Sequence, residues 1–216
     1  MLCSYLEAIR AELTVKTWFG FDLDNTLHEF RRAAGQATGL VLESVSDKYD
    51  ADLSTLKTTY QSILATKTAS VFTDGRTLTD YRKERFTALL NAHSIQAEDV
   101  YLDILASAYK GALAQALTLK SGTLKLLKKL KQLGKQVIII TEGPKDAQVW
   151  TIELLDLAPY VDVIVTTNEV GKFKTSGLFG AVLEMYGIDT KEMVYIGHKK
   201  LRDIIPTEEV GIMTIL

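Results

Sequence analysis

The sequence predicts an α/β fold in which a parallel sheet carries helices on both faces and is interrupted by a purely helical insertion. From residue 121 onward, stretches of helical periodicity alternate with short β-branched runs, and such alternation requires a parallel sheet. Residues 30–119 show almost only helical periodicity. The apolar run at residues 17–21 reads as one more strand, which has no partner unless it joins the later sheet. The helical stretch is therefore expected to be inserted after this first strand.

Before residue 121, the chain is expected to form a short amphipathic helix at residues 1–10, the first strand and about four helices. The strand ends abruptly in Asp22-Leu23-Asp24-Asn25-Thr26. The later helices are indicated by apolar side chains at intervals of three or four residues. These are Val41, Val45 and Tyr49, then Leu53, Leu56, Tyr60 and Leu64, then Phe86, Leu89 and Leu90, and then Leu102, Leu105, Tyr109, Leu113 and Leu117. The run Phe72-Thr73-Asp74-Gly75 breaks this pattern as a turn would.

After residue 121, helices and strands are expected in turn, joined by right-handed crossovers. Helices are predicted at residues 121–133, 145–155 and 176–186, and a glycine follows the first and the last of them. Strands are predicted at residues 136–140, 161–165, 193–196 and 212–216. These elements complete the sheet that the first strand begins.

Composition excludes several classes of protein. Lys and Arg number 25 against 27 Asp and Glu, which gives a net charge of −2 and no basic footprint for nucleic acid or a membrane surface. Cys3 is the only cysteine, so an internal disulfide and a cysteine metal cluster are excluded. The aliphatic run at residues 137–140 is too short to span a bilayer, and the N-terminus lacks the pattern of a secretory signal. We expect a cytoplasmic protein, either a monomer or a weak homodimer.

Polar side chains follow the predicted strands at the edge where an open parallel sheet binds its ligands, beyond the carboxyl ends. They include carboxylates, a hydroxyl and lysines: Asp22 and Asp24, Thr141, Glu169, Lys172 and Lys174, and Gly197-His198 with Asp203. This set suits phosphoryl transfer through an aspartyl-phosphate, which needs a nucleophile, an acid and base, a phosphate-oxygen donor and a cation.

Four motifs at these strand ends resemble those of the haloacid dehalogenase (HAD) superfamily of phosphohydrolases. They are Asp22-Leu23-Asp24-Asn25-Thr26, Thr141 at the end of Val-Ile-Ile-Ile-Thr, Glu-Val-Gly-Lys-Phe-Lys, and Val194-Tyr195-Ile196-Gly197 followed by Asp203. The resemblance covers residues 17–216. It implies a Rossmann-like core of residues 1–28 and 118–216 and an inserted helical cap of residues 29–117.

The resemblance also implies roles for individual residues. Asp22 would be the nucleophile, and Asp24 would protonate the leaving oxygen and then deprotonate the attacking water. The phosphoryl group would be held by Thr26, Thr141, Glu142 and Lys174. Lys174 sits where the family has its active-site lysine, although Thr175 replaces the usual proline, and Lys172 is the alternative. The presence of Asp24 argues against a true haloacid dehalogenase, which lacks this second acid.

The expected cofactor is Mg²⁺, held by Asp22, the carbonyl of Asp24 and Asp203. His198 stands where the family has a further magnesium-binding aspartate. Imidazole suits softer metals than magnesium, so either the cation is held more weakly or the site has departed from ordinary hydrolysis. If His198 has no role in the metal site, we interpret it as a polar loop residue.

These features predict a Mg²⁺-dependent phosphatase for a small phosphorylated metabolite. The alternatives are a catalytically weakened binding or regulatory protein, a phosphomutase, and a diphosphate-ester hydrolase of secondary metabolism. In the insertion, Tyr81, Arg82 and Arg85 are in a position to meet an anionic substrate, but ordinary surface charge is the preferred interpretation. His28 is a candidate for the cleft between cap and core.

Overall fold

A computed structural model describes residues 2–67 and 74–216, so Phe72 and Thr73 of the expected turn lie outside the described residues. In this part of the chain, five parallel strands form one sheet in the order β3-β2-β1-β4-β5. The strands are β1 (Trp18–Phe21), β2 (Gln136–Thr141), β3 (Val163–Thr166), β4 (Met193–Ile196) and β5 (Met213–Ile215). The first strand is central, with Phe21 opposite Ile139 on one side and Ile196 on the other. The predicted α/β class and parallel sheet are confirmed.

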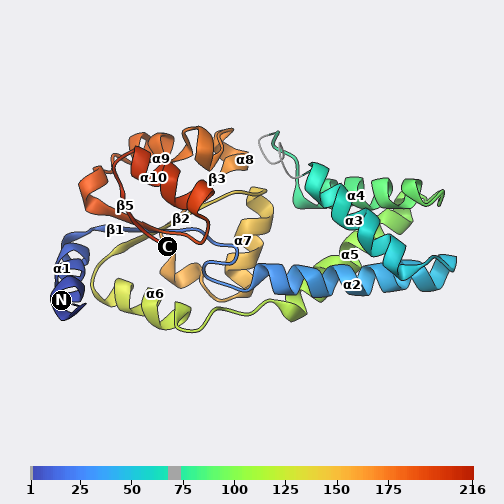
Figure 1. The fold of residues 1–216 in the computed structure, drawn as a ribbon, viewed down its shortest axis with the longest axis horizontal. Helices are drawn as coiled ribbons and strands as arrows, with labels where there is room; N and C mark the ends of the chain where they lie inside the picture. The colour runs from blue at the N-terminus through green and yellow to red at the C-terminus, as the bar shows by residue number, and fades with distance from the viewer. Residues whose placement is uncertain (1, 68–73) are drawn as a thin grey trace.

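Helices cover both faces of this sheet (Figure 1). On one face, α1 (Leu2–Val15), α6 (Thr123–Gln132) and α7 (Lys145–Leu154) contribute to an apolar cluster with Phe19, Phe21 and Ile139. On the other, α9 (Leu178–Tyr186) packs against alternate residues of β2 and β4, among them Ile138 and Tyr195. Successive strand residues point to opposite faces, which is why both sides of β2 are apolar.

Shorter helical segments lie in the connections between the strands. They are α8 (Thr167–Val170), α10 (Ile205–Glu209), one π-helical turn (Lys200–Ile204) and three 3-10 turns (Ala158–Tyr160, Lys174–Ser176, Thr190–Glu192). None of these was predicted, since segments of three to five residues are too short to show a period.

The insertion between β1 and β2 forms four helices among the described residues, α2 (Phe30–Tyr49), α3 (Leu53–Lys67), α4 (Leu78–Ala92) and α5 (Asp99–Ala116). We call these helices the helical unit. Their apolar faces meet in a separate cluster that includes Val41, Leu56, Phe86 and Leu105. In Figure 1 the helical unit extends to the right of the sheet. The boundaries at residues 28/29 and 117/118 stay a prediction.

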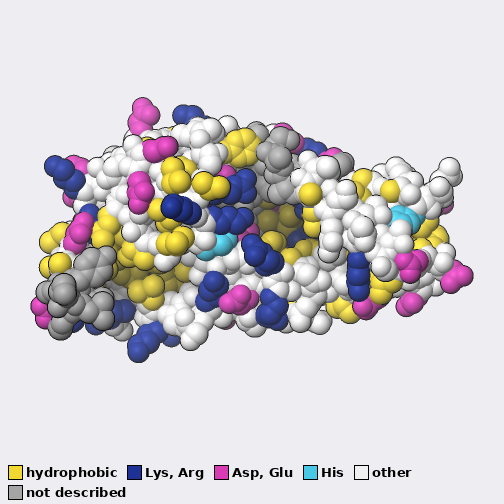
Figure 2. Space-filling view, viewed as in Figure 1, with side chains coloured by type: hydrophobic (Ala, Val, Ile, Leu, Met, Phe, Trp, Pro, Cys, Tyr) yellow, Lys and Arg dark blue, Asp and Glu magenta, His cyan; other side chains and the backbone are white. Residues whose placement is uncertain are grey.

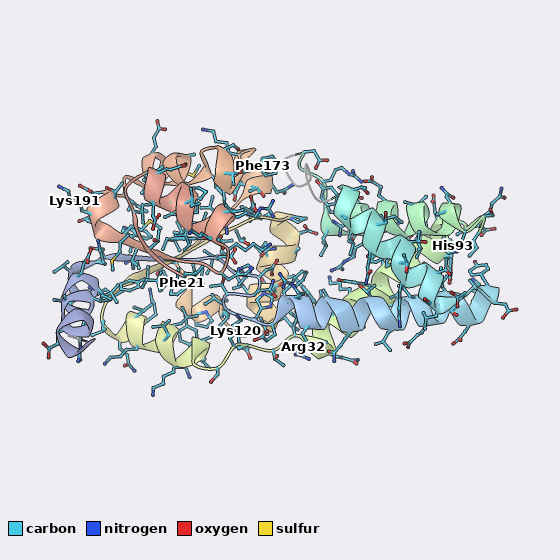
Figure 3. The ribbon with its side chains drawn as sticks, in the orientation of Figure 1. Phe21, Arg32, His93, Lys120, Phe173 and Lys191 are labelled. Carbon is cyan, nitrogen blue, oxygen red and sulfur yellow. The ribbon has the colours of Figure 1, made fainter. Side chains whose placement is uncertain are left out.

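The two crossings between sheet and helical unit are hydrogen-bonded to each other. The Glu29 amide donates to the Thr118 carbonyl at 2.9 Å, and the Lys120 amide donates to the Leu27 carbonyl at 3.0 Å. The Arg32 guanidinium donates to the Ala116 carbonyl at 2.7 Å. Arg32 and Lys120 accordingly lie close together at the base of α2 (Figure 3). The insertion thus leaves and re-enters the core at one place.

The carboxyl ends of the strands face the helical unit. Figure 3 labels Phe173, which follows β3, on the side next to that unit, and Lys191, which precedes β4, at the opposite end. A second contact joins the two parts there, since the Leu78 amide at the start of α4 donates to the Asp146 carboxylate of α7 at 3.2 Å. Over the described ranges 2–67 and 74–216, no helix has the length and hydropathy needed to cross a membrane.

Candidate active site

Asp22 lies at the centre of the predicted cluster, directly after β1, and is only 5% exposed. Its amide extends the ladder by donating to the Ile196 carbonyl of β4 at 2.9 Å. One carboxylate oxygen accepts a hydrogen bond from Lys174 Nζ at 2.6 Å, and the other accepts from Thr26 Oγ1 at 2.8 Å. Asn25 has a left-handed backbone (φ 62°), which Asn tolerates better than most residues, and this turns the chain so that Thr26 reaches back to Asp22.

Lys174 is 2% exposed and joins two carboxylates. Its ammonium lies 2.6 Å from Asp22 Oδ1 and 2.7 Å from Asp203 Oδ1. Lys172 is exposed, so the geometry favours Lys174 over this alternative. Burial alone would lower the pKa of Lys174, but Asp22 and Asp203 raise it well above its ordinary value. Burial likewise would raise the pKa of Asp22, but Lys174 and the hydrogen bonds to it hold that pKa well below its usual range. Both groups are therefore charged at neutral pH.

Asp203 is held by the backbone that follows β4. Its second oxygen accepts hydrogen bonds from the amides of His198 (3.0 Å) and Lys199 (2.8 Å). Gly197 makes this approach possible, because a Cβ there would lie 2.3 Å from Asp203 Cβ. The π-helical turn that contains Asp203 directs this buried carboxylate toward Lys174.

His198 lies within the same cluster. Its Nδ1 is 3.1 Å from Asp22 Oδ2 and 3.2 Å from Thr26 Oγ1. Its Nε2 is buried and has no hydrogen-bond partner among the described residues. Asp22, His198 and Asp203 each offer a ligand atom, and these atoms lie within 4.8 Å of one another. The donors fit a divalent cation: the carboxylates suit a hard ion such as magnesium, and the imidazole suits a softer one.

Asp24 points to a different partner. Its Oδ1 lies 3.0 Å from His28 Nε2, and the His28 side chain is fully buried. In the described part of the chain, His28 Nδ1 has no hydrogen-bond partner. An ionised carboxylate only accepts hydrogen bonds, so Nε2 is the donor when Asp24 is ionised. His28 was a candidate for the cleft from its place just past the first motif, but its pairing with Asp24 was not predicted, and only the four-residue spacing could have suggested it.

Thr141 and Glu142 follow β2, the neighbour of β1. Thr141 is the last residue of β2, so it lies on the same edge of the sheet as Asp22. It is 1% exposed, and its hydroxyl lies 3.4 Å from Gln148 Oε1. Glu142 accepts a hydrogen bond from the Lys174 amide at 3.2 Å and lies 3.3 Å from Arg202 Nε. These contacts brace the turn that carries Lys174. The phosphate-binding roles of Thr26, Thr141 and Glu142 stay predictions.

The interpretation of Tyr81 and Arg82 as surface residues is wrong. Tyr81 is 3% exposed and Arg82 is 5% exposed. Both lie in the first turns of α4, where the Arg82 guanidinium lies over the ring of Tyr109 on α5 and the Arg76 guanidinium lies over the ring of Tyr81. Sequence periodicity had assigned only the apolar positions of α4 to its inner face.

Comparison with known proteins gives consistent results. The family model described as haloacid dehalogenase-like hydrolase matches residues 17–206. A ribulose-1,5-bisphosphate 5-phosphatase from Halopiger xanaduensis is 27% identical over 198 residues, which cover 91% of this chain and 82% of that protein. A glyceraldehyde 3-phosphate phosphatase from Methanocaldococcus jannaschii is 32% identical over 94 residues, which cover 43% of this chain and 41% of that protein.

Solved structures share the fold. A HAD hydrolase from Bacillus subtilis bound to magnesium aligns with a TM-score of 0.71 at 22% identity, covering 92% of this chain and 87% of that chain. A HAD phosphatase from Thermococcus onnurineus aligns with a TM-score of 0.67 at 20% identity, covering 92% of this chain and 84% of that chain. The alignments span both the sheet and the helical unit.

Proposed function

Because the chain belongs to the haloacid dehalogenase-like hydrolase family, we propose that it is a Mg²⁺-dependent phosphatase that releases phosphate from a small phosphorylated metabolite through an aspartyl-phosphate on Asp22. The observation that carries this proposal is the buried Asp22 carboxylate, held ionised by Lys174 at the carboxyl edge of the sheet. The two curated relatives are named as phosphatases of short sugar phosphates, which supports the substrate class.

In the first half of the reaction, a carboxylate oxygen of Asp22 attacks phosphorus and forms an O–P bond while the ester O–P bond breaks. The leaving oxygen takes the proton of Asp24, which His28 orients from 3.0 Å away. Lys174 offsets the negative charge of the nucleophile and of the transferring group. The products of this half are a free alcohol and phosphorylated Asp22.

In the second half, water attacks the phosphorus of the aspartyl-phosphate and loses its proton to Asp24. The bond from phosphorus to Asp22 breaks, and inorganic phosphate leaves. Asp22 and Asp203 would hold the magnesium ion, which supplies positive charge to the phosphoryl oxygens when bound. The helical unit, above the same edge, excludes bulk water and acts as the cap that chooses the substrate.

The proposal is tested by measuring phosphate release from an aryl phosphate and from a panel of sugar phosphates, with and without magnesium. We expect turnover that a chelator abolishes and added magnesium restores. Release of free phosphate from a sugar phosphate also separates a phosphatase from a mutase, which returns the group to its substrate. No turnover of any ester, or turnover that a chelator leaves unchanged, would contradict the proposal.

Replacing His198 by aspartate is expected to tighten magnesium binding, because a carboxylate suits this hard cation better than imidazole does. We expect a gain of about tenfold, at the lower end of what changes around a metal site produce. If the change acts only through the metal, it should raise activity most when magnesium is scarce. Calorimetric titration of both proteins with magnesium measures the difference.

The matched control is His93→Asp, which makes the same chemical change at the far end of α4, where His93 contacts Thr59. This variant should bind magnesium as the unchanged protein does. Equal affinities for all three proteins would mean that His198 lies outside the coordination sphere and is a loop residue.

A further inference from the structure

Arg82 has a buried positive charge without a negative partner among the described residues. It is 5% exposed and has neither a hydrogen bond nor an ion pair to any of them. Its contact is with the ring of Tyr109 on α5, whose centroid lies 4.3 Å from the guanidinium carbon. A guanidinium carries five N–H donors, and none of those of Arg82 is bonded to the described residues.

The other buried lysines and arginines of the described residues are all satisfied. Lys174 lies between two carboxylates, and Lys16 donates to the Lys191 carbonyl at 2.9 Å. Arg82 is the exception in this group. Removing a charge from water without a partner is costly, and one aromatic contact offsets only part of that cost. The Arg82 nitrogens are not among the buried side-chain atoms that lack a partner, so its N–H groups still reach solvent and can be taken up by a ligand.

Arg82 is also in the right place for such a ligand. It lies one turn after Leu78, whose amide bonds to Asp146 of the sheet unit. Asp146 is in the first turn of α7, shortly after the carboxyl end of β2. The start of α4, with Arg82, therefore lies on the side of the helical unit that faces the carboxyl edge of the sheet, where the catalytic carboxylates are.

The surface is hollowed between the sheet and the helical unit, with Lys and Arg side chains gathered around the hollow (Figure 2). A substrate whose phosphoryl group lies at Asp22 extends from there toward the helical unit. Arginine matches the geometry of carboxylates and phosphates, to which it can donate two parallel hydrogen bonds.

We propose that Arg82, held by Tyr109, binds a second anionic group of the substrate, a carboxylate or a phosphate at the end remote from the ester that is cleaved. This inference rests on the proposed function and deepens it, since it assigns the substrate to the class of phosphate esters with two anionic ends. The neutral-ended ester of the same size is the poorer substrate.

The test compares Arg82→Met with the unchanged protein on matched substrates. Methionine keeps much of the length and removes the charge. One pair is 3-phosphoglycerate and glycerol 3-phosphate, which differ by a carboxylate; the other is fructose 1,6-bisphosphate and fructose 6-phosphate, which differ by a phosphate. We expect kcat/KM to fall by about 100-fold for the preferred two-anion substrate. For the matching ester with a single anionic group, kcat/KM should change by less than about threefold, because this ester makes no contact that Arg82→Met removes.

The two pairs also show whether the second anionic group is a carboxylate or a phosphate. It is the group carried by the two-anion substrate whose kcat/KM falls to that of its one-anion partner in Arg82→Met. A control variant, Lys57→Gln, removes one positive charge from the exposed side of α3 and should leave all four rates unchanged. If Arg82→Met slows both members of each pair equally, or slows neither, the second anion site is disproved.

Thermal unfolding excludes a merely structural role. Removal of an unpaired buried charge is expected to leave Tm unchanged or raise it, whereas loss of a structural contact lowers Tm. Calorimetric titration of both proteins with 3-phosphoglycerate and with glycerol 3-phosphate measures binding independently of turnover. If no ester is turned over, the proposed function fails, yet a binding preference for 3-phosphoglycerate that disappears in Arg82→Met still supports the site. If esters are turned over without such a preference for any two-anion compound, the site fails and the phosphatase stands.

Discussion

Replacing Asp22 by asparagine is expected to reduce phosphate release by at least about 10⁴-fold, because the amide cannot form the acyl-phosphate. The fold should be retained. Lys174 would still lie 2.7 Å from Asp203, so its charge keeps a partner after the Asp22 charge is lost. Phosphate release under saturating substrate measures the effect, and acid-quenched mass spectrometry should detect a phosphoryl group on the unchanged protein and none on the variant.

Asp47→Asn is the matched control, since it makes the same change on an exposed position of α2 and should have normal activity. Thermal unfolding of both variants checks that they fold. Substantial turnover by folded Asp22→Asn would overturn the assignment of Asp22 as the nucleophile, whatever the metal dependence of the reaction.

Replacing Lys174 by methionine is expected to cost about 3–5 kcal/mol of stability at neutral pH, which is the range for breaking a buried ion pair. It leaves Asp22 and Asp203 buried together without the cation that both contact. Turnover should be lost as well, since the charge opposite the nucleophile is gone. Urea unfolding measures the first effect and phosphate release the second.

Lys172→Met provides the control, because Lys172 is exposed and should tolerate the change in both measurements. The double variant Lys174→Met/Asp203→Asn removes one of the two facing charges and should recover part of the lost stability. A Lys174→Met protein that is as stable and active as Lys172→Met would refute the assignment of this lysine.

The cost of Lys174→Met should also depend on pH in a defined direction. The pKa of Asp22 is lowered in the folded protein, chiefly by Lys174 acting against burial. The resulting stabilisation is complete above the unfolded pKa of about 3.9 and is lost as the pH falls from there through the lower folded value. The difference in stability between the unchanged protein and the variant should therefore shrink below about pH 4. A difference that grows with acidity would contradict this origin.

Much of the fold and part of the site could be predicted because their signals are local. Strand β2 shows itself as a buried β-branched run, and Asp22 stands out as the first acid after β1. Parallel strands bring such ends to one edge, so the grouping of Asp22, Lys174 and Asp203 followed from topology alone. The preference for Lys174 over Lys172 came from the family resemblance and not from the strand pattern, since only the path of the turn after β3 decides which lysine points inward.

The remaining features depend on contacts between distant segments. Arg82 reads as a solvated charge on α4, whereas in the structure it is buried with its guanidinium over the ring of Tyr109 on α5. Glu142 follows β2, yet its partners come from the turns after β3 and β4. A polar residue carries no periodic signal that separates a surface position from a buried one, so such pairings are invisible in a single sequence.

The hydrogen-bonded crossings at Leu27–Glu29 and Thr118–Lys120 have a consequence for how the chain finds its fold. Strands β1 and β2 are neighbours in the sheet although the whole helical unit separates them in sequence. Pairing them directly would require closure of a very long loop, and non-local pairings of this kind slow folding. Four helices that assemble around their own apolar cluster bring both crossings together first. The entropy of closing the loop is then already lost within the helices, and β1 meets β2 across a connection that is effectively as short as an ordinary crossover through the single helix α6.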